Sequence, residues 1–208
     1  MSGEGWERSW KTSSNGTIHM TVASMNSTEH RRDVIFTTDK HEEGWRISAH
    51  ELSYLGSSTA TLSRVIYTST QPIQLLKAVD EGAIIVAASE ERVLLGSLRS
   101  TNFSTVDKIK YEFRIFESTN FVSSLDARVS KRGSGTKLDK VKVVDVVVGD
   151  AKGAIFVHND LLRNLIGSQK STTDAKHPIS LIPRKLHWHR KAVHCVKWSL
   201  DGLSCFIV

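Results

Sequence analysis

The sequence predicts an all-β fold. Apolar and β-branched residues gather in short, strand-sized runs, and only three prolines interrupt the 208 residues. Alternation of apolar and polar residues with a period of two is frequent, whereas the i, i+3, i+4, i+7 spacing of an amphipathic helix is hard to find anywhere. No apolar run approaches the roughly 18 residues that a membrane-spanning helix needs.

Several segments predict individual strands. Residues 44–52, 64–70 and 110–116 are short alternating runs bounded by turn residues, and residues 83–88 and, apart from Lys142 and Asp145, 142–149 are continuously apolar. Continuous runs of this length are typical of strands that are buried on both faces. A helical candidate, 158–168, has Asp160 as a possible N-cap and Gly167 as a stop, although a loop turn explains it equally well.

Composition indicates a globular chain with a basic balance. Hydrophobic residues make up 39% and charged residues 24%, the formal net charge is +6, and the isoelectric point is about 9.4. Such a balance favours polyanionic partners, because each neutralised phosphate releases counterions. The two cysteines form no disulfide framework, which favours a cytosolic or nuclear compartment. The N-terminus lacks the basic-then-apolar order of a signal peptide.

A strand–turn–strand unit recurs along the chain. Its three copies are residues 34–52, 84–98 and 146–160. The strands that lead into such units share a skeleton, since Ile73 and Leu76 stand three apart, as do Val193 and Val196. The units recur at intervals of about 50 to 60 residues, which is typical of four-stranded propeller blades with loop insertions.

The C-terminal segment resembles the start of a WD repeat. The positions at that family's offsets are His189, Val193, Val196, Trp198, Ser199, Asp201 and Gly202. Residues 146–159 are similar to the family's following hairpin, with Gly149 and Gly153 in place. They depart from it at Lys152, where the family has a turn aspartate, and at His158, where it has tryptophan. The resemblance implies a WD-repeat-type β-propeller, with about three blades and the start of a fourth.

The blade boundaries follow from this resemblance. After a poorly defined N-terminal segment, 1–16, the blades are expected at about 17–68, 73–117 and 122–189, with an incomplete blade from 193. A propeller must close, because an open row of blades exposes sheet faces and edges. We therefore expect the chain to be a fragment of a longer protein, or to be completed by other chains.

A closer resemblance is to the WDR75 family of WD-repeat proteins. Residues 111–129, 146–162 and 186–202 resemble successive blades of that family, which belongs to the UTP-A (t-UTP) subcomplex of the small-subunit processome. The resemblance implies a non-catalytic scaffold in the nucleus and nucleolus. It would assemble on nascent pre-rRNA for small-subunit rRNA processing and support rRNA transcription. The implied partners are other WD-repeat UTP-A subunits, pre-rRNA and snoRNP components, with no membrane and no small-molecule substrate. The alternative is a generic WD-repeat adaptor that binds peptides in a ubiquitin-ligase or trafficking complex.

A cluster of possible ligands lies near the C-terminus: His187, His189, His194 and Cys195. Their spacing is not that of the common structural zinc sites, and strand alternation puts His194 and Cys195 on opposite faces. Cys195 stands mid-strand, where it resembles a small buried hydrophobe more than an activated nucleophile. The favoured interpretation is architectural, with His189 bonding a backbone group or a turn residue. We expect no catalytic residue, no cofactor and no metal ion.

Residues 128–142 form a basic insertion. Its cations are Arg128, Lys131, Arg132, Lys137, Lys140 and Lys142. We interpret these residues as candidate contacts to RNA phosphates or to an acidic partner surface. The alternative is a solvated hairpin extension that touches nothing.

Overall fold

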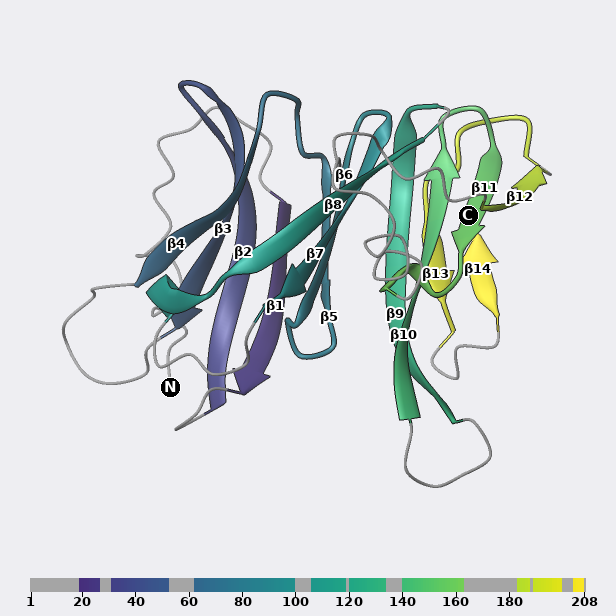
Figure 1. Cartoon of the computed structure of the whole chain (residues 1–208). Coiled ribbons are helices and arrows are strands. Elements are labelled where there is room, and N and C mark those ends of the chain that lie inside the picture. The colour runs from purple at the N-terminus through teal and green to yellow at the C-terminus, as the bar shows by residue number, and fades with distance from the viewer. Residues whose placement is uncertain are drawn as a thin grey trace, which may run out of the picture.

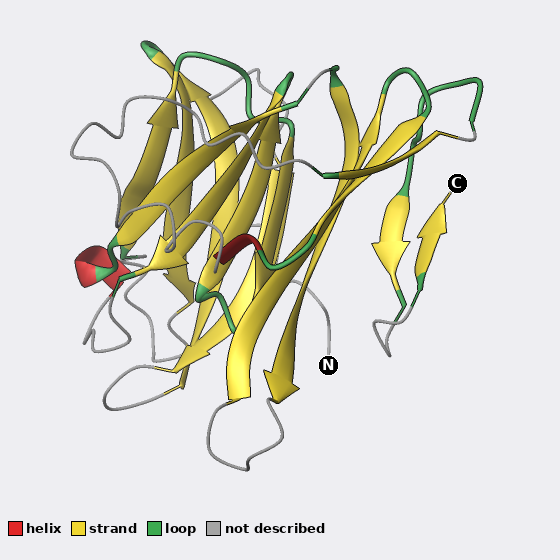
Figure 2. Cartoon of the chain, turned by 45° about the vertical axis from the view of Figure 1, so that its right-hand side comes forward, coloured by secondary structure: helices red, strands yellow, loops and turns green. Residues whose placement is uncertain are grey.

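The computed structural model describes residues 19–26, 31–52, 62–99, 106–118, 120–133, 140–162, 183–187, 189–199 and 204–207. Most of these residues belong to strands, which form three four-stranded antiparallel sheets and one two-stranded sheet (Figures 1 and 2). The predicted all-β class is confirmed. Of the helical candidate 158–168, His158 ends a strand, Leu161 and Leu162 are helical, and residues 163–168 lie outside the described ranges.

Within each sheet the strands follow one another in chain order. The first sheet holds β1 (His19–Asn26), β2 (Arg31–His41), β3 (Gly44–Leu52) and β4 (Ser63–Ser69). The second holds β5 (Leu75–Val79), β6 (Ile84–Ser89), β7 (Arg92–Leu98) and β8 (Tyr111–Glu117), with the 3-10 turn η1 (Val106–Lys108) ahead of β8. The third holds β9 (Val122–Gly133), β10 (Lys140–Asp150), β11 (Ala154–His158) and β12 (Arg184–His187). The fourth pairs β13 (Val196–Trp198) with β14 (Cys205–Ile207).

The first strands of successive sheets lie side by side. β1 contacts β5, β5 contacts β9, and β9 contacts β13. The sheets therefore pack face to face in chain order, as Figure 1 shows from left to right. This arrangement is compatible with a fragment of a β-propeller.

Apolar layers fill the spaces between the sheets. Val34 and Phe36 of the first sheet pack with Ile85 of the second. One residue further along β6, Val86 belongs to the layer that also holds Val146 of the third sheet. Because successive side chains of a strand point to opposite faces, β6 is buried on both faces. Its continuous apolar run follows from this position.

The β9–β10 hairpin extends beyond the rest of its sheet. β10 pairs with β11 only over Val146–Gly149, whereas it pairs with β9 from Lys140 to Asp150. The first half of β10 and the second half of β9 therefore form a two-stranded ribbon, which projects at the bottom of Figure 1.

Candidate functional site

The basic insertion is the projecting ribbon. Lys131 pairs with Lys142, Arg132 with Val141, and Gly133 with Lys140. This register places Lys131 and Lys142 at opposite positions of the two strands. Lys137 lies outside the described residues.

Lys142 also ties the ribbon to the second sheet. Its Nζ lies 2.7 Å from Oδ2 of Asp80, which belongs to the turn between β5 and β6. The Lys142 side chain is 52% exposed, so water screens this ion pair and the ammonium keeps an open side.

Arg128 has a different setting from the other cations of the insertion. Its Nε and Nη2 donate to Oδ2 of Asp145 at 3.1 and 2.9 Å, and the Asp145 side chain is fully buried. The guanidinium also lies 4.1 Å from the centre of the Trp198 ring. Arg128 thus holds the third and fourth sheets together, and its charge is used within the fold.

The WD-like positions meet where β13 approaches the third sheet. Val193 and Val196 are buried against Val147 and Ile155. The carbonyl oxygen of Val193 accepts hydrogen bonds from the Ser123 and Ser124 hydroxyls, both at 2.8 Å.

The two glycines of this region permit close approaches of the chain. A Cβ at Gly149 would overlap the side chains of Ser124 and Val193. Gly153 has φ +86°, and a Cβ at this position would lie 2.1 Å from the carbonyl oxygen of His189. His189 thus reaches the turn through its backbone, while Nε2 of His187 lies 3.2 Å from the carbonyl oxygen of Lys152.

The strand that begins at Val196 is tied to the third sheet by an acid. The backbone nitrogen of Trp198 donates to Oδ2 of Asp126 at 2.8 Å. Ser199 closes the β13–β14 hairpin through bonds with Ser204. Asp201 and Gly202 lie outside the described residues.

The sequence pattern did not single out three buried aspartates: Asp126, Asp145 and Asp150. Oδ1 of Asp150 accepts the backbone nitrogens of Lys152 at 2.9 Å and Ala154 at 2.7 Å, and Oδ2 accepts Asn120 Nδ2 at 2.7 Å. Asp150 therefore orders the turn at which Lys152 replaces the WD-type aspartate. The signal in the sequence was an acid at the end of, or inside, an otherwise apolar run.

The histidine–cysteine cluster does not converge. His194 is exposed and Cys195 is half-buried beside the buried Val193 and Val196. Within the described ranges, no group of three or more His, Cys, Asp and Glu side chains is placed to hold a metal ion. Burial lowers the pKa of a different histidine, His158, to about 4, so this ring is neutral at physiological pH.

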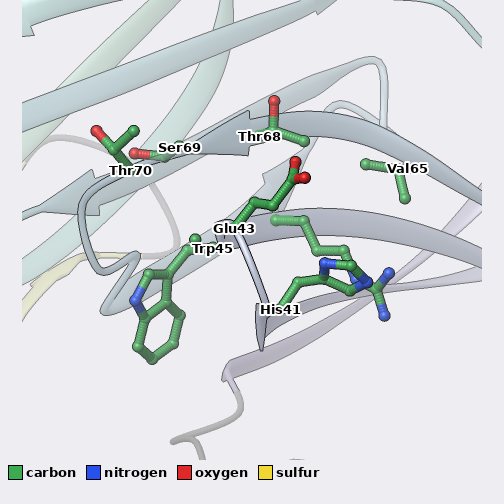
Figure 3. A pocket seen from close by; sticks show the side chains of 9 residues that line it. His41, Glu43, Trp45, Val65, Thr68, Ser69 and Thr70 are labelled. Atoms are coloured by element: carbon green, nitrogen blue, oxygen red, sulfur yellow. The ribbon is translucent and has the colours of Figure 1, made fainter.

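Two clefts lie at the end of the sheets opposite the ribbon. One, of about 380 Å³, is lined by His41, Glu43 and Trp45, among others. Figure 3 shows the Trp45 ring turned away from the His41 and Glu43 side chains, so these groups do not converge on one ligand atom. The other, of about 480 Å³, is lined by Trp45, His19 and Phe121 with their neighbours.

A third cleft, of about 390 Å³, lies between the outer strands β4 and β8, on the side of the ribbon. Three cations line it: Arg64, Arg99 and Lys110.

Comparisons with models of known protein families and with curated proteins found no match. Among the helical residues that the structure describes, no segment is long and apolar enough to cross a membrane.

Proposed function

We propose that this chain forms part of a WD-repeat-type β-propeller and acts as a non-catalytic scaffold subunit of the small-subunit processome. In this role it would assemble on nascent pre-rRNA with other WD-repeat UTP-A subunits in the nucleolus. The observation that carries the propeller is the packing of successive four-stranded sheets with their first strands side by side.

A scaffold role is supported by how firmly the sheets are joined. The Asp126 carboxylate is buried, with 4% of the residue exposed. Its Oδ2 accepts a hydrogen bond from the backbone nitrogen of Trp198 in the fourth sheet, and its Oδ1 lies 2.8 Å from Lys77 Nζ in the second. A single carboxylate therefore bonds three sheets, in addition to the apolar layers. A rigid body of this kind positions the loops and ribbons at its rim for binding.

An RNA-associated role is supported by the ribbon. Lys131, Lys140 and Lys142 lie on strands that project away from the packed sheets, and phosphate contacts need cations that a nucleic acid can reach. The specific assignment to the processome rests on the resemblance of residues 111–129, 146–162 and 186–202.

Affinity purification of the tagged full-length protein tests this proposal. Mass spectrometry should recover WD-repeat nucleolar proteins, and sequencing of the bound RNA should recover pre-rRNA. A variant with Lys131, Arg132 and Lys137 changed to Gln should lose RNA recovery before it loses protein partners. Recovery with a ubiquitin ligase or coat complex alone would contradict the proposal and favour the peptide adaptor.

A further inference from the structure

We propose that the cleft between β4 and β8 binds the phosphate backbone of single-stranded RNA. Arg64 of β4, Arg99 after β7 and Lys110 before β8 supply the cations. The choice of RNA as ligand rests on the proposed function. The site itself rests on residues that lie outside the basic insertion.

The described ends of the connection between β7 and β8, Arg99 and residues 106–110, form one wall of the cleft. The Arg99 nitrogen donates to the Lys110 carbonyl oxygen at 2.9 Å, which holds the two ends of the connection together. The Val106 nitrogen donates to the buried Glu51 carboxylate of the first sheet at 3.3 Å. Ile109 is 1% exposed and packs in the apolar layer that holds Val34 and Phe36 of the first sheet. Arg99 and Lys110 are thus held next to the first sheet, where Arg64 lies.

The charge of the cleft is positive. Its acid, Glu112, has one oxygen 3.2 Å from Arg99 and the other bonded to Arg114, which already offsets its charge. The Arg99 side chain is 63% exposed, so its ion pair is weak and exchangeable. Arg64 and Lys110 then add two positive charges to the rim of the cleft.

The cleft also has an apolar part between the cations. Val65 is 44% exposed there, whereas Ile109 is buried and Tyr111 is half-buried with its hydroxyl on the Gly82 carbonyl oxygen. Cations beside an exposed apolar residue suit single-stranded nucleic acid, because phosphates meet the charges while a sugar or base covers the apolar part.

The cleft and the basic ribbon flank the same turn. The Tyr111 hydroxyl donates to the carbonyl oxygen of Gly82 in the β5–β6 turn, and Lys142 binds Asp80 of that turn. Lys142 thus partly offsets the charge of Asp80. Two separated basic sites on one side of the molecule fit an extended polyanion better than a short acidic peptide, and this favours RNA.

The decisive experiment measures binding of the full chain to a fluorescent oligouridylate of about 15 nucleotides. The cleft variant combines Arg64→Gln with Lys110→Gln. Since each phosphate contact adds about 0.7 to the slope of log K against log salt, the variant should lower that slope by about 1.4. It should also weaken binding about ten-fold or more at about 50 mM NaCl. Fluorescence anisotropy at several salt concentrations gives both values.

A matched control combines Lys40→Gln with Arg190→Gln. Both residues are exposed, and they lie near the turns at the opposite end of the sheets. This control makes the same change in net charge and should leave the affinity within about two-fold. Arg64→Lys with Lys110→Arg keeps the charges and should retain binding. Thermal unfolding of each variant shows whether the fold is kept.

The outcomes separate this inference from the proposed function. Loss of RNA affinity in both the cleft variant and the ribbon variant supports both. Loss in the ribbon variant alone overturns the cleft site and leaves the proposed function standing. Absence of binding by the unaltered chain contradicts the RNA contact at both places. Binding of a polyglutamate peptide that depends on Arg64 and Lys110, with RNA binding unaffected, assigns the cleft to an acidic protein and overturns the inference.

Discussion

At the scale of single residues, buried carboxylates decide which cations are available to a partner. Asp145 is fully buried and bound to Arg128, whereas Asp80 binds a lysine that is half exposed. The basic run 128–142 therefore contains residues of two kinds. Its sequence could not separate them, because strand alternation turns Arg128 toward the fourth sheet, and only the placement of Trp198 reveals that contact.

Replacing Arg128 should affect stability first. Arg128→Ala leaves the buried Asp145 carboxylate without its cation, and breaking a buried pair in this way costs about 3–5 kcal/mol of unfolding free energy. Urea denaturation measures the loss. Arg184→Ala, on the exposed end of β12, is the control and should cost less than about 0.5 kcal/mol. A stable Arg128→Ala protein with weakened RNA binding would show that Arg128 contacts RNA.

His158 should make the fold sensitive to acid. Burial lowers its pKa from 6.5 to about 4, so between these values the unfolded chain binds a proton that the folded chain does not. The contribution of His158 to the unfolding free energy is fully present above pH 6.5. It is lost as the pH drops toward 4, which lowers the unfolding free energy by up to about 3 kcal/mol. Urea denaturation of His158→Leu at pH 7.5 and pH 5 should show a smaller acid loss than the unaltered chain. An equal loss would show that other groups cause it.

At the scale of elements, the apolar runs predicted the strands well. β6, β8 and β10 coincide closely with the runs 83–88, 110–116 and 142–149. These strands could be predicted because their burial appears in the sequence as local runs of apolar or alternating residues. The role of Asp150 could not be predicted in the same way. The WD pattern has its turn aspartate at the position of Lys152, and Asp150 stands two residues before it. The ion pair between Lys77 and Asp126 joins different sheets and leaves no local signal.

The turn between β10 and β11 should tolerate no side chain at Gly153. Its φ of +86° and the carbonyl oxygen of His189 both oppose a Cβ, so Gly153→Ala should lower the unfolding free energy by about 2 kcal/mol or more. Ala151→Gly, exposed in the same turn, is the control and should cost less than about 1 kcal/mol. Equal stability of the two variants would show that the chain around His189 does not cover this turn.

At the scale of the whole molecule, the sheets are held together along their first strands. Asp126 is one of these links, since it forms an ion pair with Lys77 on one side and accepts a hydrogen bond from the backbone nitrogen of Trp198 on the other. The resulting body presents a basic ribbon and a basic cleft on one side. The apolar alternation indicated the sheets, but the order in which they pack depends on contacts between distant segments.

Removing the Asp126 carboxylate should loosen the fourth sheet selectively. Asp126→Ala deletes the acceptor of the Trp198 nitrogen, so amide hydrogen exchange in 196–207 should become faster than in the first sheet. Lys197→Ala is the control, because Lys197 is 56% exposed and lies 4.0 Å from the same carboxylate. Uniform acceleration across all sheets would mean that the sheets unfold as one unit.

If this molecule is a scaffold on pre-ribosomal RNA, ultraviolet crosslinking in cells should capture the contact. The tagged full-length protein is crosslinked and purified, and both the attached RNA and the crosslinked peptides are identified. We expect pre-rRNA, attached to peptides from 128–142 and from the cleft that Arg64 and Lys110 line. Crosslinked RNA without pre-rRNA enrichment, or crosslinks confined to the opposite end of the sheets around Trp45 and Phe121, would contradict it.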